Sequence, residues 1–228
     1  PAEAKYDNEH FVFDAATGTI TEYTGESYRL DVPETIDRVS VRTIGANAFN
    51  GNWNLIYLTL PEGLTAIEDG AFESAYQLSF VEFPSTLRTI GNRAFYNYRG
   101  GKLMLPEGLE RIGDEAFYRC SVRGTLELPE GLKEIGDSAF ARSIFMRTLD
   151  LPSTLEIIGE HAFEDVSLSY VYMDGLTPPK VAKTAFAECT SLADIELNEY
   201  CTKQQMLDMQ AIIDEAGLNC RVWRYENT

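Results

Sequence analysis

Basic residues, histidine and cysteine are scarce in this sequence, and each shortage argues against a class of function. The chain of 228 residues has 19 Lys and Arg against 36 Asp and Glu, a formal net charge of −17. Binders of nucleic acid or of anionic membranes take most of their affinity from cationic side chains, so neither partner is expected. No apolar run approaches the roughly 20 residues that span a bilayer, so we also expect no membrane insertion.

Motifs for catalysis or metal binding are also missing. The two histidines, His10 and His161, lie far apart, and neither has a cysteine or carboxylate at metal-ligand spacing. The sequence contains no G-x-S-x-G segment, phosphate-binding loop or EF-hand loop. We therefore expect no enzyme, no cofactor and no metal.

A strict repeat is what the sequence does contain. Phenylalanine recurs with spacings of 23, 23, 22, 23, 23 and 23 residues, at Phe49, Phe72, Phe95, Phe117, Phe140, Phe163 and Phe186. The unit reads L-x-L-P-x-x-L-x-x-I-G-x-x-A-F and is followed by a variable stretch. A fixed period of this length is typical of a solenoid, in which stacked units bury a core that no single unit can bury alone.

Each position of the unit has a physical interpretation. The L-x-L alternation predicts a strand with one buried face, and the proline after it ends the strand. We expect the Phe rings to form a continuous spine. The Gly four residues before Phe occurs in five of the seven copies, so it does not indicate a strictly positive φ. Asp114 and Asp137 suit the N-cap of a short helical turn that carries Ala-Phe.

The repeat divides the chain into an N-terminal cap at 1–29, seven repeats at 30–197 and a C-terminal cap at 198–228. The first cap contains two alternating segments about Thr17-Gly18, which predict a hairpin. Thr202 and Gln205 predict a capping box for a helix that ends at Gly217. A last strand is expected over 218–225.

The cysteines do not predict a disulfide framework. Cys120 and Cys189 both lie three residues after a repeat Phe, and stacked coils place them roughly 14 Å apart, beyond disulfide reach. We expect two buried thiols there. A bridge between Cys201 and Cys220 is unfavourable because the helix between them runs roughly 21 Å over 14 residues, and three returning strand residues recover only roughly 10 Å.

These repeats resemble the BspA-like family of bacterial leucine-rich repeats, the treponemal subclass with a unit of 22–23 residues. The resemblance covers about 30–197, and its L-P-x-x-L-x-x-I-G-x-x-A-F signature is specific. It implies an α/β, β-rich fold: a right-handed curved solenoid with a parallel sheet on one face. It also implies a bacterial protein that is secreted or displayed at the cell surface, serves adhesion or protein–protein contact and has no catalytic activity. The chain starts at Pro1 without a leader pattern, so we expect any export signal to lie outside it.

One candidate binding surface is the variable stretch after Phe in the central repeats. Residues 1–57 carry 9 acidic and 4 basic residues and 149–228 carry 14 and 5, whereas 58–148 carry 13 and 10. Stacking brings the basic and aromatic residues of this stretch to one edge, and both types are enriched at protein interfaces. The alternative is a solvated edge whose arginines pair with acids such as Glu73 and Glu115. This Arg/Tyr edge comprises Tyr96, Tyr98, Arg99, Lys102, Tyr118, Arg119, Arg123, Arg142, Phe145 and Arg147.

A second candidate surface is the outward face of the predicted sheet, where aromatic and acidic residues mix. Its members are Tyr57, Phe80, Met104, Tyr170 and Tyr172, and Lys102 joins it to the Arg/Tyr edge. Such a face suits a protein or a glycan partner, and it also suits ordinary cross-strand packing. The leading hypothesis is a protein-binding or adhesion module. The alternatives are a carbohydrate or cell-wall binder, which would use the exposed aromatic rings as platforms, and a structural spacer. No signal for an oligomeric state is present.

Overall fold

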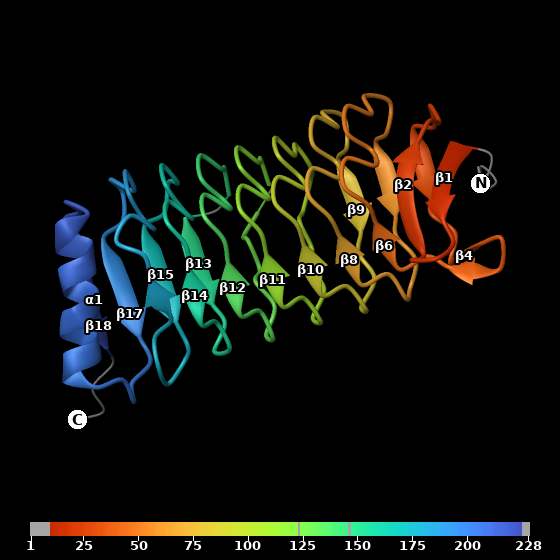
Figure 1. The fold of residues 1–228 in the computed structure, drawn as a ribbon. Coiled ribbons are helices and arrows are strands. Elements are labelled where there is room, and N and C mark those ends of the chain that lie inside the picture. Colours follow the sequence, from red (N-terminus) through yellow and green to blue (C-terminus); the bar gives the residue numbers. More distant parts are fainter. Residues whose placement is uncertain (1–9, 123, 146, 225–228) are drawn as a thin grey trace.

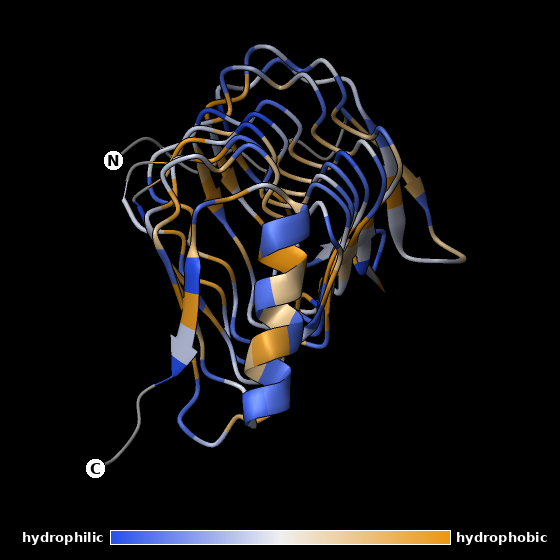
Figure 2. Cartoon of the chain, turned by 90° about the vertical axis from the view of Figure 1, so that its left-hand side faces the viewer, coloured by the Kyte–Doolittle hydropathy of each residue, from blue (hydrophilic) through white to orange (hydrophobic). Residues whose placement is uncertain are grey.

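The computed structural model describes residues 10–122, 124–145 and 147–224. The chain winds as a solenoid of stacked coils, with strands β1 (Phe11–Asp14) and β2 (Thr19–Tyr23) at one end and helix α1 (Lys203–Glu215) at the other (Figure 1). Viewed from the C-terminal end, the coils superimpose around a common interior and α1 lies across the opening (Figure 2). The predicted β-rich solenoid is therefore the fold of this chain.

One parallel sheet runs the length of the array on the aliphatic residue five positions before each Phe. Its strands are short because each contributes one buried side chain, as Ile90 and Ile112 do in neighbouring coils. This continuous sheet was not predicted, and only its first pair is antiparallel. Its order is β1 (Phe11–Asp14), β2 (Thr19–Tyr23), β6 (Thr43–Ile44), β8 (Ala66–Ile67), β10 (Thr89–Ile90), β11 (Arg111–Ile112), β12 (Glu134–Ile135), β14 (Ile157–Ile158) and β16 (Lys180–Val181).

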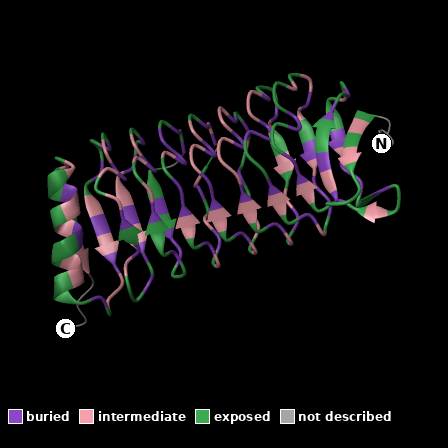
Figure 3. Cartoon of the chain, in the orientation of Figure 1, coloured by how far each residue is buried: buried purple, intermediate pink, exposed green. Residues whose placement is uncertain are grey.

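The predicted parallel sheet on the L-x-L segments is present in two pieces, which we call the broken sheet. Buried and exposed residues alternate along its strands, as expected (Figure 3). In the gap between the pieces, the described residues show one isolated bridge, Met104 to Glu127. The pieces are β3 (Arg29–Asp31), β7 (Tyr57–Thr59) and β9 (Phe80–Glu82), and then β13 (Thr148–Leu151), β15 (Tyr170–Met173), β17 (Asp194–Leu197) and β18 (Arg221–Arg224).

The break coincides with the one repeat of 22 residues. From Phe95 to Pro106 the chain has 11 residues, whereas the same distance is 12 in the neighbouring repeats. The shortened segment includes Gly100 and Gly101. Leu103 is 2% exposed and Met104 is 62% exposed, so the inward and outward faces keep their order, but among the described residues no strand pairing joins residues 102–105 to β9.

The phenylalanine spine is confirmed. All seven rings are at most 2% exposed, and successive ring centroids lie 4.9–5.6 Å apart with interplanar angles of 4–23°. Tyr23 of β2 continues the stack, 5.0 Å from Phe49, and Phe11 of β1 packs on Tyr23. The N-terminal hairpin therefore extends the spine as well as covering its end. Stacked aromatic pairs contribute about 0.5–1.5 kcal/mol each beyond area burial.

The residues before Phe form turns and not helical caps. The Asp114 carboxylate, expected to cap its own coil, accepts a hydrogen bond from the backbone N–H of Asp137 in the next coil at 2.9 Å. Asp137 accepts in the same way from Glu160 at 2.7 Å. The second residue before and the second residue after Phe adopt positive φ in most coils, for example Arg93 at 56° and Arg119 at 53°.

The glycines four residues before Phe allow neighbouring coils to approach each other closely. Gly91, Gly113, Gly136 and Gly159 do not have positive φ. An added Cβ at any of them would meet the Asp or Asn side chain of the preceding coil and its backbone closer than 3.0 Å.

Both ends contain elements that the repeat does not supply. From Leu30 to Phe49 the first repeat spans 19 residues, five more than the regular unit, and it contains a small hairpin of β4 (Thr35–Ile36) and β5 (Val39–Ser40). At the other end, α1 (Lys203–Glu215) begins with the predicted capping box of Thr202 and Gln205 and is followed by Gly217 at φ 70°. The last strand starts at Arg221 rather than Leu218, and Tyr225 lies outside the described residues.

All four cysteines are buried and unbridged, consistent with the unfavourable geometry expected for a Cys201–Cys220 disulfide. Cys120 is 1% exposed and Cys189 is 0% exposed. Burial raises the pKa of Cys120 to about 12 and that of Cys189 to about 11. Both side chains therefore behave as small apolar groups.

Candidate binding surfaces

The Arg/Tyr edge contains an ordered ladder of side chains. The rings of Tyr96 and Tyr118 stack with centroids 5.1 Å apart at 11°. The guanidinium of Arg93 lies 4.1 Å from the Tyr96 centroid, and that of Arg119 lies 5.6 Å from the Tyr118 centroid. Arg93 was not among the predicted residues because it precedes Phe95, at a position that varies between copies. Its contact with Tyr96 places its guanidinium on the same edge.

Some of the cationic side chains on this edge are neutralised by carboxylates of the same chain, and others remain available to a partner. Arg93 forms salt bridges with Glu73 and Glu115, which raise the pKa of its guanidinium further above its usual value. Lys102 pairs with Glu127 at 3.1 Å. The alternative of intramolecular pairing is therefore correct for part of the edge.

Three further arginines of the edge are exposed, and their cations remain available. Within the part of the chain that the structure describes, Arg99, Arg119 and Arg147 form no salt bridge. Arg142 lies 3.9 Å from Glu164, at the limit of an ion pair. Arg123 lies outside the described residues.

Two predicted members of the edge belong to the core. Tyr98 is 4% exposed, packs edge-on against Phe95 and donates its hydroxyl hydrogen to the carbonyl of Ser79 at 3.0 Å. Phe145 is 7% exposed and packs edge-on against Phe140. The periodicity contained the signal for Tyr98, because it lies three residues after a repeat Phe, as buried Cys120 does.

The outward face of the broken sheet carries exposed aromatic and apolar side chains near the break. Tyr57, Phe80 and Met104 are 41%, 50% and 62% exposed. The two rings stack with centroids 4.9 Å apart at 8°. Because neighbouring strands lie about 4.8 Å apart, this is the direct cross-strand pair that the register of β7 and β9 creates.

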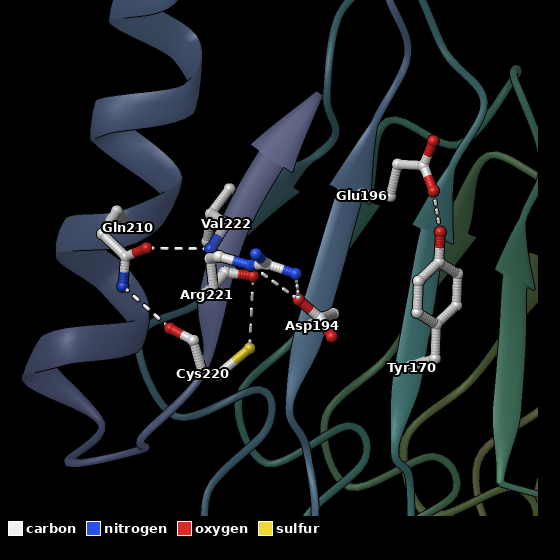
Figure 4. A network of polar contacts seen from close by, with 7 residues as sticks. All are labelled: Tyr170, Asp194, Glu196, Gln210, Cys220, Arg221 and Val222. Carbon is white, nitrogen blue, oxygen red and sulfur yellow. Dashed lines mark hydrogen bonds and ion pairs between the residues drawn. The ribbon is translucent and has the colours of Figure 1, made fainter. Parts of the chain in front are cut away.

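Tyr170 and Tyr172 are half-buried, and their hydroxyl groups are engaged. Tyr170 donates to Glu196 of the neighbouring strand, and Tyr172 donates to Asp174 at 3.1 Å. The same end of the sheet contains an ion pair of Arg221 with Asp194 at 2.6 Å, beside α1 (Figure 4). Burial and Asp174 raise the pKa of Tyr172. These contacts connect the last strands and leave the two tyrosines less available than Tyr57 and Phe80.

A groove of about 710 Å³ opens at the break in the sheet. The apolar part of its wall includes Leu58, Val81, Phe83 and Leu105, which sequence reasoning assigned to the core. A second hollow adjoins it and shares three lining residues, Arg29, Thr59 and Glu82. No repeat pattern predicts this groove, because it results from the shortened repeat.

The described residues contain no cluster of three or more His, Cys, Asp or Glu side chains arranged to hold a metal ion. Among the same residues, no helix combines the length and the apolar character that a membrane crossing requires. The exposed residues on the two surfaces offer hydrogen bonding, cationic and aromatic contact, which are the means of recognition.

A known repeat family matches this chain in sequence, and solved structures match it in fold. A family model described as a BspA type leucine-rich repeat region matches in six copies, over residues 42–169 and 111–207. The crystal structure of a leucine-rich cell surface protein from Faecalibacterium prausnitzii A2-165 is 26% identical with a TM-score of 0.68, covering 82% of this chain and 52% of that chain. This chain thus spans about half the length of that protein.

A second solved structure shares the fold. The leucine-rich repeat protein of T. pallidum is 19% identical with a TM-score of 0.52, and the match covers 93% of this chain and 94% of that chain. No curated protein matches the sequence.

Proposed function

The chain belongs to the BspA-type leucine-rich repeat family, and on that premise we propose that it is a non-catalytic module that binds a protein at a bacterial cell surface. The location is supported by the cell surface description of the F. prausnitzii protein. The observation that carries the proposal is the ladder of Tyr96 and Tyr118, which has an available cation, Arg119, at its end.

The ladder suits recognition of a protein because it is held rigidly on stacked coils. Tyr and Arg are enriched among the residues that contribute most of the binding energy at protein interfaces. The Arg93 pairs with Glu73 and Glu115 fix the neighbouring side chains. Arg99 and Arg119 then present positive charge in the central part of a strongly acidic chain, so we expect a partner surface with carboxylates opposite them.

The test is capture of partners from serum and extracellular matrix by the wild-type chain and by a variant with Arg99→Glu and Arg119→Glu. We expect the variant to lose most capture while its thermal midpoint stays within about 2 °C, because surface substitutions change stability little. Lys180→Glu combined with Lys203→Glu is the matched control: the pair makes the same total charge change at two exposed lysines that do not belong to the edge. Equal capture by all three proteins would refute the role of this edge.

Glycan binding is a second candidate, favoured by the exposure of Tyr57 and Phe80. The geometry weakens it, because each ring covers one face of the other. Sugar rings stack on free aromatic faces. Binding of a glycan array that is lost in Tyr57→Ala and kept in Arg119→Glu would place this candidate first.

A further inference from the structure

The break in the sheet exposes side chains that are buried in the regular coils. At the two inward L-x-L positions, Leu58 and Leu60 are 2% and 4% exposed, and Leu149 and Leu151 are 0% and 1% exposed. Of the inward residues next to the break, Leu103 and Leu126 are 2% and 1% exposed, whereas Val81, Phe83, Leu105 and Leu128 are only partly buried. The groove therefore reaches apolar groups that an unbroken sheet would cover.

Exposed apolar side chains extend this surface outward. Tyr57, Phe80 and Met104 line the groove above the partly buried residues. Its volume of about 710 Å³ falls within the range of about 300–1,000 Å³ typical of ligand sites. Exposed apolar surface that is concave and continuous with the core indicates a site for an apolar group.

The adjoining hollow is acidic. Asp31, Glu34, Glu62 and Glu82 line it with Arg29, a net charge of −3. None of the four carboxylates forms a salt bridge with any residue that the structure describes. The backbone N–H and the hydroxyl of Ser85 donate to Glu62 and lower the pKa of its carboxyl group, so its charge persists in mildly acidic solution.

We propose that the groove binds an extended segment of the partner protein, with one large apolar side chain in the break and basic side chains over the acidic hollow. This rests on the proposed function and names the chemistry of the partner. The first and fourth coils are separated by three coil spacings, about 14 Å. An extended chain rises about 3.3 Å per residue, so the basic and apolar side chains stand about four residues apart.

Charge complementarity favours a basic peptide segment over a neutral ligand in the groove. A basic segment neutralises the carboxylates, whereas a neutral glycan leaves them uncompensated beside the apolar groove. Arg29 lies in the first coil and lines both hollows, so it disfavours a partner cation directly above it. The cations are therefore expected farther along, over Glu34 and Glu62.

Methyl NMR of protein labelled at the methionine methyl groups tests the proposal. The probe is the acetylated, amidated pentapeptide Lys-Lys-Ser-Gly-Phe, and the control peptide has Glu in place of both Lys. We expect the probe, but not the control peptide, to cause a saturable shift of the Met104 signal. The signals of the buried Met173 and Met209 should stay unchanged. Resonances are assigned with Met→Leu variants.

The charge contribution is tested with Glu34→Gln and Glu62→Gln together. The second substitution keeps an amide oxygen as an acceptor for Ser85, so the fold is preserved. We expect binding of the probe to weaken by roughly 2- to 30-fold, since each of the two exposed ion pairs contributes about 0.2–1 kcal/mol. Ile144→Gln, an exposed site on the other edge, should bind the probe as wild type does.

Three results would overturn the groove proposal: no saturable Met104 shift, equal shifts with both peptides, or a shift with N-acetylchitotriose in place of the probe. Its failure is distinguishable from failure of the proposed function. If partner capture depends on Arg99 and Arg119 but the Met104 signal does not shift with the probe, the proposed protein binding stands and only the groove proposal is refuted.

Discussion

Alanine at Gly136 should destabilise the array in a way that depends on Asp114 in the preceding coil. A Cβ at Gly136 would meet the Asp114 carboxylate oxygen, with the backbone of Gly113 and Asp114 at 2.7 and 2.8 Å. The same contact recurs at every Gly that follows a coil with Asp or Asn at this turn. The two repeats without the Gly carry Glu68 and Ala182, and there the preceding coil has Ala46 and Glu160 instead.

The expected magnitudes follow from these contacts. Overpacking at Gly136 costs about 1–3 kcal/mol, partly offset by the lower entropy of the unfolded chain with Ala. Asp114→Ala removes the acceptor for the Asp137 N–H, 2.9 Å away, and costs about 1 kcal/mol at this half-exposed site. In the double variant the carboxylate contact no longer exists. We therefore expect the two costs to fall short of additivity by about 1 kcal/mol.

The assay is urea denaturation of wild type, both single variants and the double variant, followed by circular dichroism with m-values compared. Ala182→Gly is the control. It places Gly where the fold already accepts a side chain, and it should cost only about 0.5–1 kcal/mol through backbone entropy. Additivity of the two variants within about 0.3 kcal/mol would refute the reasoning that the carboxylate requires the glycine.

Three further results are expected. Phe117→Ala should lower the free energy of unfolding by about 3–5 kcal/mol, because the ring is 0% exposed between two stacked neighbours, and Ile144→Ala should change it by less than about 0.5 kcal/mol in the same denaturation assay. Tyr98→Phe should cost about 1 kcal/mol through loss of the hydrogen bond to Ser79 and leave partner capture unchanged; reduced capture at full stability would return Tyr98 to the binding surface. Because burial raises the pKa of Cys120 from 9.0 to about 12, the neutral thiol stabilises the fold fully below pH 9, and this contribution decreases as the pH rises from 9 to 12. Urea midpoints at about pH 8 and about pH 10.5 should therefore differ less in Cys120→Ala than in wild type, and an equal difference would contradict the assignment.

The periodic part of the structure was predictable because each coil contacts mainly its neighbours. An apolar residue type that recurs at one position of every repeat, such as Phe117 and its equivalents, indicates that this position is buried. The capping box of Thr202 and Gln205 was likewise readable, since a helix start depends on residues three positions apart. The same logic, applied to the position three residues after Phe, would have placed Tyr98 in the core.

The candidate site was only partly predictable. Tyr96, Tyr118 and Arg119 do share one edge, as stacking required. Whether each arginine is neutralised depends on distances between side chains of different coils, which no period contains. For that reason the charge of Arg93 is neutralised by two carboxylates, whereas the guanidinium of Arg119 lies over the aromatic ring of Tyr118.

By itself, the sequence determined the solenoid, the aromatic spine and the two caps, because local patterning and nearest-neighbour stacking are sufficient to specify them. Tertiary structure alone decided the break in the sheet. A repeat that is one residue short has several ways to adjust, and packing against the coils on both sides selects among them. That selection leaves Phe83 and Leu105 partly exposed beside Met104, in a groove that adjoins the acidic hollow of the first coils. The scaffold is thus a consequence of the period, and the groove is a consequence of its one interruption.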